Sequence, residues 1–344
     1  MSKRRATANP AQTPTDDARP SAAGRKSRRT EKLPAFLERD AQTLYNELWG
    51  YPAHTSHFIA STPVSLERRH LSNNLSETHV VGEKNDGERK LLLVGAPEDN
   101  GEKPYIVFMN RSRKLHLIAR CATNEIPTRT HFMVPGKSQD IDLCDGTLLD
   151  GELMPDGTFI VFDCVTAGGY DTKNMPFEER MRVASVCTKA LRGYVNCRAK
   201  RFYPLDQLMS VVEQPTGPCD GLILMPRHIP VRTGRHDNCF KWKPTHKCTV
   251  DLVHKDGVFY AVGEGGKWVP AEMEVDGVKL VPPVSSTPLV TNMIYEVAPP
   301  GKGDDDTPWT IVGPRPDKMA ANYITTIRRT LLTIRDNIRP EDIR

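Results

Sequence analysis

Short runs of strand-forming residues, separated by turn signals, fill the chain from residue 79 to residue 225 and constrain its fold most strongly. In chain order these runs are HVVGE, KLLLVG, YIVFMN, KLHLIA, GTLLDGEL, TFIVFDCV and GLILM. Runs of this length that alternate with turns are typical of antiparallel sheet. We therefore expect a sheet-rich fold into which a few helices are inserted.

Apolar residues at helical spacing predict helices at three places in the chain. The first stripe runs over residues 37–48, and Gly50 is its predicted stop. A second helix is expected over residues 177–194. The last stripe begins at Ile324 and ends at Ile338.

After Pro244 the sequence contains only strand and loop signals until that last helix. TVDLV and VFYAV flank a turn at residues 254–257, and EMEVDGVKLV forms a second hairpin with Asp276 and Gly277 at its tip. About seventy residues of hairpins fit a small β-barrel of the oligonucleotide-binding (OB) type.

These signals predict an α+β protein with three parts. Residues 1–32 form a basic tail, and residues 33–244 form a domain of antiparallel sheets with flanking helices. Residues 245–319 form a C-terminal OB-fold β-barrel domain with a terminal helix, and residues 320–344 are expected to pack back onto the larger domain.

The tail over residues 1–32 carries all of the positive charge excess. The whole chain has a formal net charge of +4, but the tail holds nine Lys and Arg against three acidic residues. It contains no Leu, Ile, Val, Phe, Tyr or Trp, so it cannot offset the entropy of ordering, and we expect it to be disordered. Its clusters KRR and RKSRR fit a nuclear import signal, a salt-sensitive nucleic-acid arm, or a solubilising tail without an address. No apolar stretch approaches the roughly 18 residues that a membrane-spanning helix needs.

Charged residues gather at the ends of the predicted strands. Lys84 begins the segment KNDGER between the first two runs, where Lys followed by Asn-Asp-Gly is by itself an ordinary turn. Asp150 and Glu152 lie in a later run, and Asp220 precedes GLILM. Lysines 241 and 243 follow in KWKP. Together they indicate a site where neighbouring strands end.

One hairpin brings two carboxylates and an aromatic ring to the same face. Residues 154–158 form a Pro-Asp-Gly turn with Gly157 in the left-handed region. A three-residue loop then pairs Glu152 with Ile160 and Asp150 with Phe162, and opposed residues share a face. The carboxylates would hold ribose hydroxyls and Mg²⁺, and the ring of Phe162 would stack on a base.

The ordered set KNDGER, NRSRKLHLI, LLDGEL, FIVFD, DGLIL, KWKP and RPDK resembles the motif pattern of the mRNA guanylyltransferases. These are the GTP-using capping branch of the covalent nucleotidyltransferases, a superfamily that also contains the ATP- and NAD-dependent DNA ligases and the RNA ligases. The resemblance extends from residue 62 to residue 322, so the domain over residues 33–244 would be the nucleotidyltransferase domain. Each motif alone is a weak signal, but coincidence does not explain all of them in this order.

The resemblance makes Lys84 the nucleophile. Its amine would attack the α-phosphorus of GTP, expel pyrophosphate and hold GMP as a phosphoramidate, which would then pass to the 5′-diphosphate end of RNA. Lysine attacks as the free amine, and Lys241 and Lys243 would favour that form and neutralise charge on the α-phosphate.

The resemblance also implies contacts for the rest of GTP. They are the ribose contacts of Arg89 and Glu152, the phosphate contact of Arg111, the guanine stack of Phe162, the guanine O6 contact of Lys200, and the β,γ-phosphate contacts of Arg315, Asp317 and Lys318. The metal, Mg²⁺ or Mn²⁺, would be bound by Asp220 and Glu152. Asn110 precedes Arg111 where the family pattern usually has aspartate.

RPDK favours GTP-dependent capping over ligation, because ligases usually end differently. Two alternatives stay open: an ATP-dependent RNA or DNA ligase of the same superfamily, and a catalytically inactive RNA-binding module. No His-Cys-x5-Arg phosphatase signature is present, so a separate RNA 5′-triphosphatase and a separate cap methyltransferase are expected partners. The transcribing polymerase is a further candidate partner. The expected location is the nucleus, or the cytoplasm if the host is viral.

Overall fold

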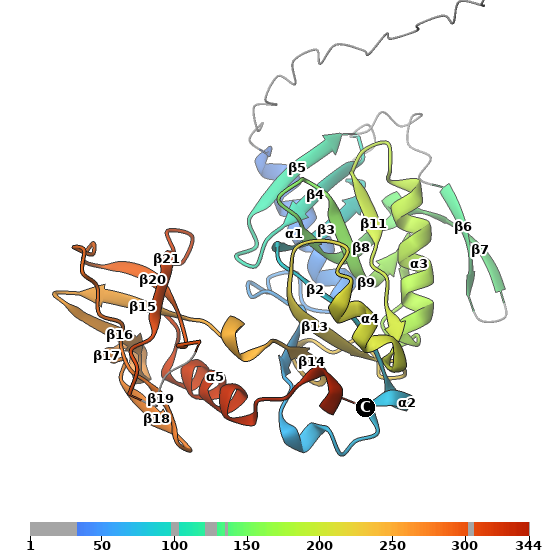
Figure 1. The fold of residues 1–344 in the computed structure, drawn as a ribbon. Coiled ribbons are helices and arrows are strands. Elements are labelled where there is room, and N and C mark those ends of the chain that lie inside the picture. Colours follow the sequence, from blue (N-terminus) through green and yellow to red (C-terminus); the bar gives the residue numbers. More distant parts are fainter. Residues whose placement is uncertain (1–32, 98–102, 121–128, 135–136, 302–305, 344) are drawn as a thin grey trace, which may run out of the picture. The chain divides into compact units, whose positions relative to one another are not determined.

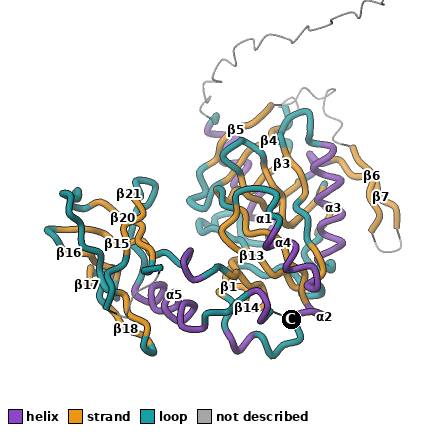
Figure 2. Tube along the Cα trace, viewed as in Figure 1, coloured by secondary structure: helices purple, strands orange, loops and turns teal. Residues whose placement is uncertain are grey.

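The computed structural model describes residues 33–97, 103–120, 129–134, 137–301 and 306–343. The predicted disordered tail over residues 1–32 lies outside the described residues. Strands dominate the described residues and helices are few (Figure 2), so the protein is α+β as predicted. None of the described helices is long and apolar enough to cross a membrane.

The α-helices of the described residues are α1 (Ala35–Trp49), α2 (Leu75–Thr78), α3 (Phe177–Ala190), α4 (Leu208–Glu213) and α5 (Ile324–Asp336). Short 3₁₀ helices lie at Arg68–His70, Leu143–Asp145, Leu205–Gln207, Thr245–Lys247, Glu264–Gly266 and Pro340–Asp342.

The predicted helix ends hold where a capping residue fixes them. Gly50 ends α1 in the left-handed conformation, with φ of +77°, as predicted. Asn337 adopts φ of +40° after α5, so the helix stops before Ile338, which the sequence pattern had wrongly included. The helix α3 ends at Ala190, four residues before the predicted end, and its chain continues as turns.

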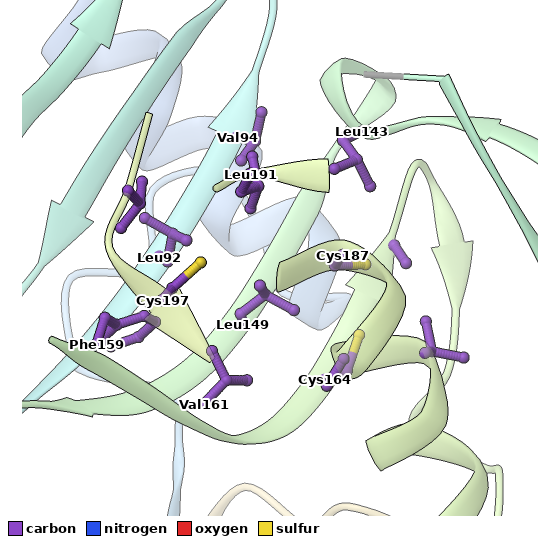
Figure 3. Close-up of a cluster of buried hydrophobic side chains, with 14 of the residues drawn as sticks. Leu92, Val94, Leu143, Leu149, Phe159, Val161, Cys164, Cys187, Leu191 and Cys197 are labelled. Carbon is purple, nitrogen blue, oxygen red and sulfur yellow. The ribbon is translucent and has the colours of Figure 1, made fainter. Parts of the chain in front are cut away.

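A seven-stranded sheet, here called the central sheet, carries helices on both faces (Figure 1). Its order is β10 (Tyr170–Asp171), β9 (Phe159–Ala167), β8 (Thr147–Leu153), β3 (Glu88–Gly95), β4 (Tyr105–Met109) and β5 (Leu115–Arg120), with β11 (Cys197–Ala199) paired to β9. Leu92 and Val94 of β3 pack in the cluster that includes α3, which Figure 3 shows. Leu91 and Leu93 point to the other face and pack with α1. Burial on both faces explains why KLLLVG is continuously apolar.

A second sheet of five strands carries the segment that contains Lys84. Its order is β1 (Ser61–Ser65), β14 (Gly234–Trp242), β13 (Cys219–Pro226), β2 (His79–Asn85) and β12 (Tyr203–Pro204). Most strand pairs in the two sheets are antiparallel, as predicted, but β1 pairs with β14 and β11 pairs with β9 in parallel. The prediction failed for these pairs because each joins strands far apart in sequence or with a helix between them.

The C-terminal strands form a third sheet. Its order is β17 (Trp268–Pro270), β16 (Val258–Val262), β15 (Val250–Lys255), β20 (Met293–Ala298) and β21 (Thr310–Pro314). Two hairpins stand apart from the large sheets: β18 (Met273–Val275) with β19 (Val278–Leu280), and β6 (Arg129–Val134) with β7 (Lys137–Asp142).

The expected turns and the last helix complete this C-terminal part. Asp276 and Gly277 both have positive φ at the tip of the predicted hairpin. Ile327 and Leu331 of α5 are fully buried against the third sheet. Beyond α5 the chain contacts the second sheet, where the indole of Trp242 donates a hydrogen bond to the carbonyl oxygen of Ile338 at 2.8 Å.

Candidate active site

A cavity of about 150 Å³ lies between the second sheet and the central sheet. Seven of the residues singled out from the sequence line it: Lys84, Arg89, Arg111, Asp150, Glu152, Phe162 and Lys200. Lys84 and Arg89 reach it from different sheets, because β2 and β3 belong to different sheets and are joined by the short turn at Asp86 and Gly87. The turn thus delivers Lys84 and Arg89 to facing walls of one cavity.

Lys84 forms an ion pair with the carboxylate of Asp220, near the start of the neighbouring strand β13. Its Nζ lies 2.7 Å from Oδ1 of Asp220, and Nζ of Lys243 lies 2.5 Å from the other oxygen of that carboxylate. Partial burial alone would raise the pKa of Asp220. The hydrogen bonds from Lys243 and Lys84 outweigh burial and lower that pKa below its ordinary value.

The position of Asp220 depends on the glycine that follows it. Gly221 pairs with Lys84 across the sheet, and a Cβ at Gly221 would lie 2.0 Å from the carbonyl oxygen of Trp242. The register between β13 and β2 shifts at this point, which leaves Asp220 as the extra residue of a bulge. Only glycine therefore allows the close strand approach that brings Asp220 to Lys84.

Lys241 lies in β14, and Lys243 directly follows that strand. Because they are two residues apart, their side chains lie on the same side of the sheet, which is also the side of Lys84. Burial, followed by the charges of Lys243 and Lys84, lowers the pKa of Lys241. The structure thus brings all three lysines into one electrostatic cluster, as the sequence predicted. A site with this concentration of positive charge suits a phosphate group.

Arg89 is fixed by a buried ion pair with Asp150. Its Nε and Nη2 lie 2.9 Å and 2.5 Å from the two oxygens of Asp150, and both side chains are under one tenth exposed. The guanidinium also lies 5.5 Å from the ring centre of Phe162. The carboxylate of Asp150 therefore positions Arg89. The ribose and Mg²⁺ contacts expected of the Asp150 carboxylate stay a prediction.

The hairpin register is partly as predicted. Gly157 has φ of +83°, and Glu152 pairs with Ile160. A register shift after Asp150 makes Asp150 oppose Asp163, so the predicted pairing of Asp150 with Phe162 was wrong. Phe162 nevertheless lines the cavity together with Glu152, because it lies two residues after Ile160, the strand partner of Glu152, and so shares its face. Burial raises the pKa of Glu152, against the lowering influence of Lys84 and Arg89.

The side-chain amine of Lys200 donates a hydrogen bond to the carbonyl oxygen of Glu83 in β2. Burial lowers its pKa to about 8, even though Glu152 and Glu83 oppose the shift. Arg111 also lines the cavity, and burial together with the charge of Arg89 lowers its pKa. Asn110 accepts backbone hydrogen bonds from Ser112 and Lys114, so it shapes the turn that follows β4.

The remaining three predicted residues lie elsewhere. Arg315 makes ion pairs with Asp317 at 2.9 Å, with Glu296 at 3.2 Å and with Asp251 at 3.3 Å. Lys318 lies 3.6 Å from Asp251. Asp251 and Glu296 belong to β15 and β20, so the RPDK segment is bound to the third sheet, and none of its residues lines the cavity.

Sequence reasoning missed part of the cavity wall. Asp163 lines it and is held by a buried ion pair with Arg180 of α3, at 2.7 Å and 3.1 Å. Phe202 and Asn85 are further lining residues. The signal for the ion pair was an arginine on the apolar stripe of α3, between Phe177 and Val183.

The donor set at Asp220 and Glu152 fits a hard divalent cation. Among the described residues no cluster of three or more His, Cys, Asp or Glu side chains could hold a metal alone. Magnesium usually takes one or two protein carboxylates and completes its shell with water and substrate phosphates. Two carboxylates beside a cluster of three lysines are therefore compatible with Mg²⁺ bound together with a nucleotide.

Comparisons with known proteins agree with this chemistry. The family described as "mRNA capping enzyme, catalytic domain" matches residues 27–245. The mRNA-capping enzyme subunit alpha of Schizosaccharomyces pombe is 26% identical over 83% of this chain and 79% of its own length. The corresponding subunit of Yarrowia lipolytica is 24% identical over 83% of this chain and 81% of its own. The mRNA-capping enzyme of Caenorhabditis elegans is 23% identical over 58% of this chain, which spans only 33% of that protein.

Solved structures are more distant. A mycobacterial DNA ligase D complexed with ATP and MES is similar over 75% of this chain and 94% of its own, with 15% identity and a TM-score of 0.42. The family match covers well over half of the chain and includes Lys84, Arg89, Glu152, Phe162 and Lys243. The chain therefore belongs to the mRNA capping enzyme family, the guanylyltransferases of the covalent nucleotidyltransferase superfamily.

Proposed function

We propose that Lys84 is the residue that carries GMP between GTP and RNA. The observation that carries this proposal is the position of Lys84 on the wall of the cavity between the two sheets, 2.7 Å from Asp220 and beside Lys241 and Lys243. Lysine is a nucleophile only as the free amine, so Lys84 must release Asp220 before it attacks.

The first step is a substitution at the α-phosphorus of GTP. A bond forms between Nζ of Lys84 and the α-phosphorus, and the bond from that phosphorus to the bridging oxygen breaks. Pyrophosphate leaves with the electron pair of the broken bond. Lys241 and Lys243 stabilise the negative charge that grows on the α-phosphate oxygens. In the second step a terminal phosphate oxygen of 5′-diphosphate RNA attacks the same phosphorus, and Lys84 is the leaving group.

Other residues of the cavity would orient the nucleoside. Phe162 offers a ring for the guanine base, and Lys200 offers a donor for its O6 atom. Arg89 and Glu152 would bind the ribose hydroxyls, and Arg111 would bind a phosphate. Their fixed positions support this role: Arg89 is locked by Asp150 and cannot rotate freely.

Asp220 and Glu152 would hold Mg²⁺ or Mn²⁺ together with the nucleotide. Such a cation supplies charge neutralisation for the phosphates and for the leaving pyrophosphate.

We also propose the division into a nucleotidyltransferase domain over residues 33–244 and an OB-fold domain over residues 245–319. The antiparallel third sheet and its added hairpin support the barrel assignment. Residues 320–344 would belong to both parts, because α5 packs on the third sheet while Ile338 and Ile343 pack with the second sheet.

Arg315, Asp317 and Lys318 would bind the β,γ-phosphates of GTP and the pyrophosphate product. Their ion pairs with Asp251 and Glu296 support a preformed grip, because the RPDK segment is held in one geometry by β15 and β20.

The proposed acceptor is RNA with a 5′-diphosphate end. A separate RNA 5′-triphosphatase would prepare that end, a separate methyltransferase would modify the cap, and the transcribing polymerase is a candidate docking partner. The designation "subunit alpha" of the fungal relatives supports action with other subunits. The proposed location is the nucleus, where mRNA ends are first available.

The test is covalent labelling in the presence of Mg²⁺. Protein incubated with α-phosphate-labelled GTP should carry label through denaturing electrophoresis, and labelled ATP should give none. Lys84→Ala and Lys84→Arg should both abolish the label, because a guanidinium stays protonated and does not attack.

Lys90→Ala is the matched control for this test. Lys90 lies on the adjoining strand, pairs with Glu88 and does not line the cavity, so its loss should leave labelling unchanged. Label retained by Lys84→Ala, or label from ATP in place of GTP, would refute the proposed function.

A further inference from the structure

A second, larger cavity lies between the end of α3, β11 and the segment that leads into β12. It is distinct from the cavity that Lys84 lines, which we call the nucleotide cavity. The volume of the second cavity is about 440 Å³, within the roughly 300–1,000 Å³ of typical ligand sites. We call it the basic hollow, because five cationic side chains line it: Lys189, Arg192, Arg198, Lys200 and Arg201. Figure 1 shows α3 and β11 side by side along this region.

The positive charge of the basic hollow is not neutralised from within. Among the described residues, Lys189, Arg192, Arg198 and Arg201 have no ion pair and no side-chain hydrogen bond. The single carboxylate that lines the hollow is that of Glu83, and it is already engaged. It accepts hydrogen bonds from the backbone and hydroxyl of Thr216. Several unpaired cations in one concave surface attract a polyanion.

The basic hollow shares two wall residues with the cavity of the active site. Lys200 lines both the hollow and the nucleotide cavity. Asn85, the residue after Lys84, lines both as well, and it also lines a third cavity of about 270 Å³ that shares Arg198 and Thr216 with the hollow. A polyanion seated in the basic hollow would therefore have one end within reach of the nucleotide on Lys84.

The second step of the proposed function needs such a ligand. An RNA acceptor must bring its terminal phosphate to the GMP on Lys84, and the phosphates behind that end must lie somewhere on the protein. Contacts from Arg and Lys to phosphates fix position without reading sequence, which suits an enzyme that acts on many RNAs. Tyr203 also lines the hollow and offers an aromatic face to a base.

We propose that the basic hollow binds the sugar-phosphate backbone of the acceptor RNA, over the nucleotides that follow its 5′-diphosphate end. This inference rests on the proposed function, because it assigns the path of the second substrate of that reaction. Arg192 and Arg198 are its principal phosphate contacts among the residues that do not line the nucleotide cavity.

The experiment compares Arg192→Ala/Arg198→Ala with wild-type protein and with a control, Arg328→Ala/Arg329→Ala. The control removes two exposed arginines of α5, which do not line any of these three cavities. The binding of a short fluorescent 5′-diphosphate RNA is measured by anisotropy from low to moderate salt. The hollow variant should bind about tenfold more weakly at low salt, and its salt slope should fall by about 1.4, at about 0.7 for each lost phosphate contact.

Two enzymatic measurements separate this inference from the function on which it rests. The GMP adduct should form at the wild-type rate in the hollow variant, because neither arginine lines the nucleotide cavity. Single-turnover transfer from that adduct to RNA should be slowed at sub-saturating RNA by the same factor as binding. If wild-type protein formed no adduct, the proposed function would fail, and the binding comparison would still report on the hollow.

The inference is overturned by either of two results. In the first, the RNA affinity and the salt slope of the hollow variant equal those of the wild type, or they fall no further than those of the control. The second is retained RNA affinity with loss of binding to a fluorescent phosphoserine peptide, which would assign the hollow to an acidic protein partner.

Discussion

Removing the charge of Asp150 should destabilise the protein strongly, because Asp150 is the counter-ion of the buried Arg89. Asp150 and Arg89 form a bidentate pair at 2.9 Å and 2.5 Å, with side chains 4% and 8% exposed. Asp150→Asn keeps the shape but leaves a buried guanidinium without its counter-ion. Removing one partner of a buried ion pair costs about 3–5 kcal/mol of unfolding free energy.

The magnitude is checked with a double-mutant cycle. Arg89→Met in the Asp150→Asn background removes the uncompensated charge, so the double variant should recover about 2–3 kcal/mol relative to Asp150→Asn alone. Urea unfolding followed by tryptophan fluorescence measures each free energy. The double variant should still form no GMP adduct, since stability returns while the proposed ribose contact of Arg89 does not.

A surface ion pair supplies the control. Arg235 and Asp237 pair at 2.6 Å with side chains 46% and 70% exposed, so Asp237→Asn should leave the free energy of unfolding nearly unchanged. A cost for Asp150→Asn as small as that of the control, or a double variant no more stable than Asp150→Asn, would refute the assignment of a stabilising buried pair.

Three further outcomes follow from particular residues. The pKa of Lys200 is lowered to about 8, so its charge is lost as the pH rises through that value. GTP affinity should therefore fall in that pH range in the wild type but not in Lys200→Arg, whose side chain stays charged. The same pH dependence of GTP affinity in both proteins would contradict a contact of Lys200 to guanine. Gly221→Ala should destabilise the protein by about 3 kcal/mol in urea unfolding, because its Cβ would meet a backbone oxygen at 2.0 Å, whereas Gly217→Ala, with no atom within 4 Å, should be nearly neutral. Lys318→Ala should slow formation of the GMP adduct about 100-fold. Single-turnover transfer of GMP from preformed adduct to RNA should be unchanged, because this step no longer involves pyrophosphate. Equal losses in both steps would exclude a role of Lys318 that is specific to pyrophosphate.

The sequence alone determined the features that depend on neighbours along the chain. The strand runs, the stop at Gly50 and the turns at Gly157 and Asp276–Gly277 are local, since each needs only the backbone preferences of a few residues. The order of the family motifs likewise identified six of the residues that line the nucleotide cavity, because that order is a property of the chain and not of its packing.

Tertiary structure decided whatever depends on residues distant in sequence. The ion pair of Asp150 with Arg89 joins residues 61 apart in the sequence, which no local pattern encodes. The parallel pairing of β1 with β14 and the unpaired cations of the basic hollow have the same origin. A charge in the sequence indicates only that a side chain can bind an anion. Whether a carboxylate forms an ion pair with it is fixed by which segments the fold brings together, and Arg192 and Arg198 form none among the described residues.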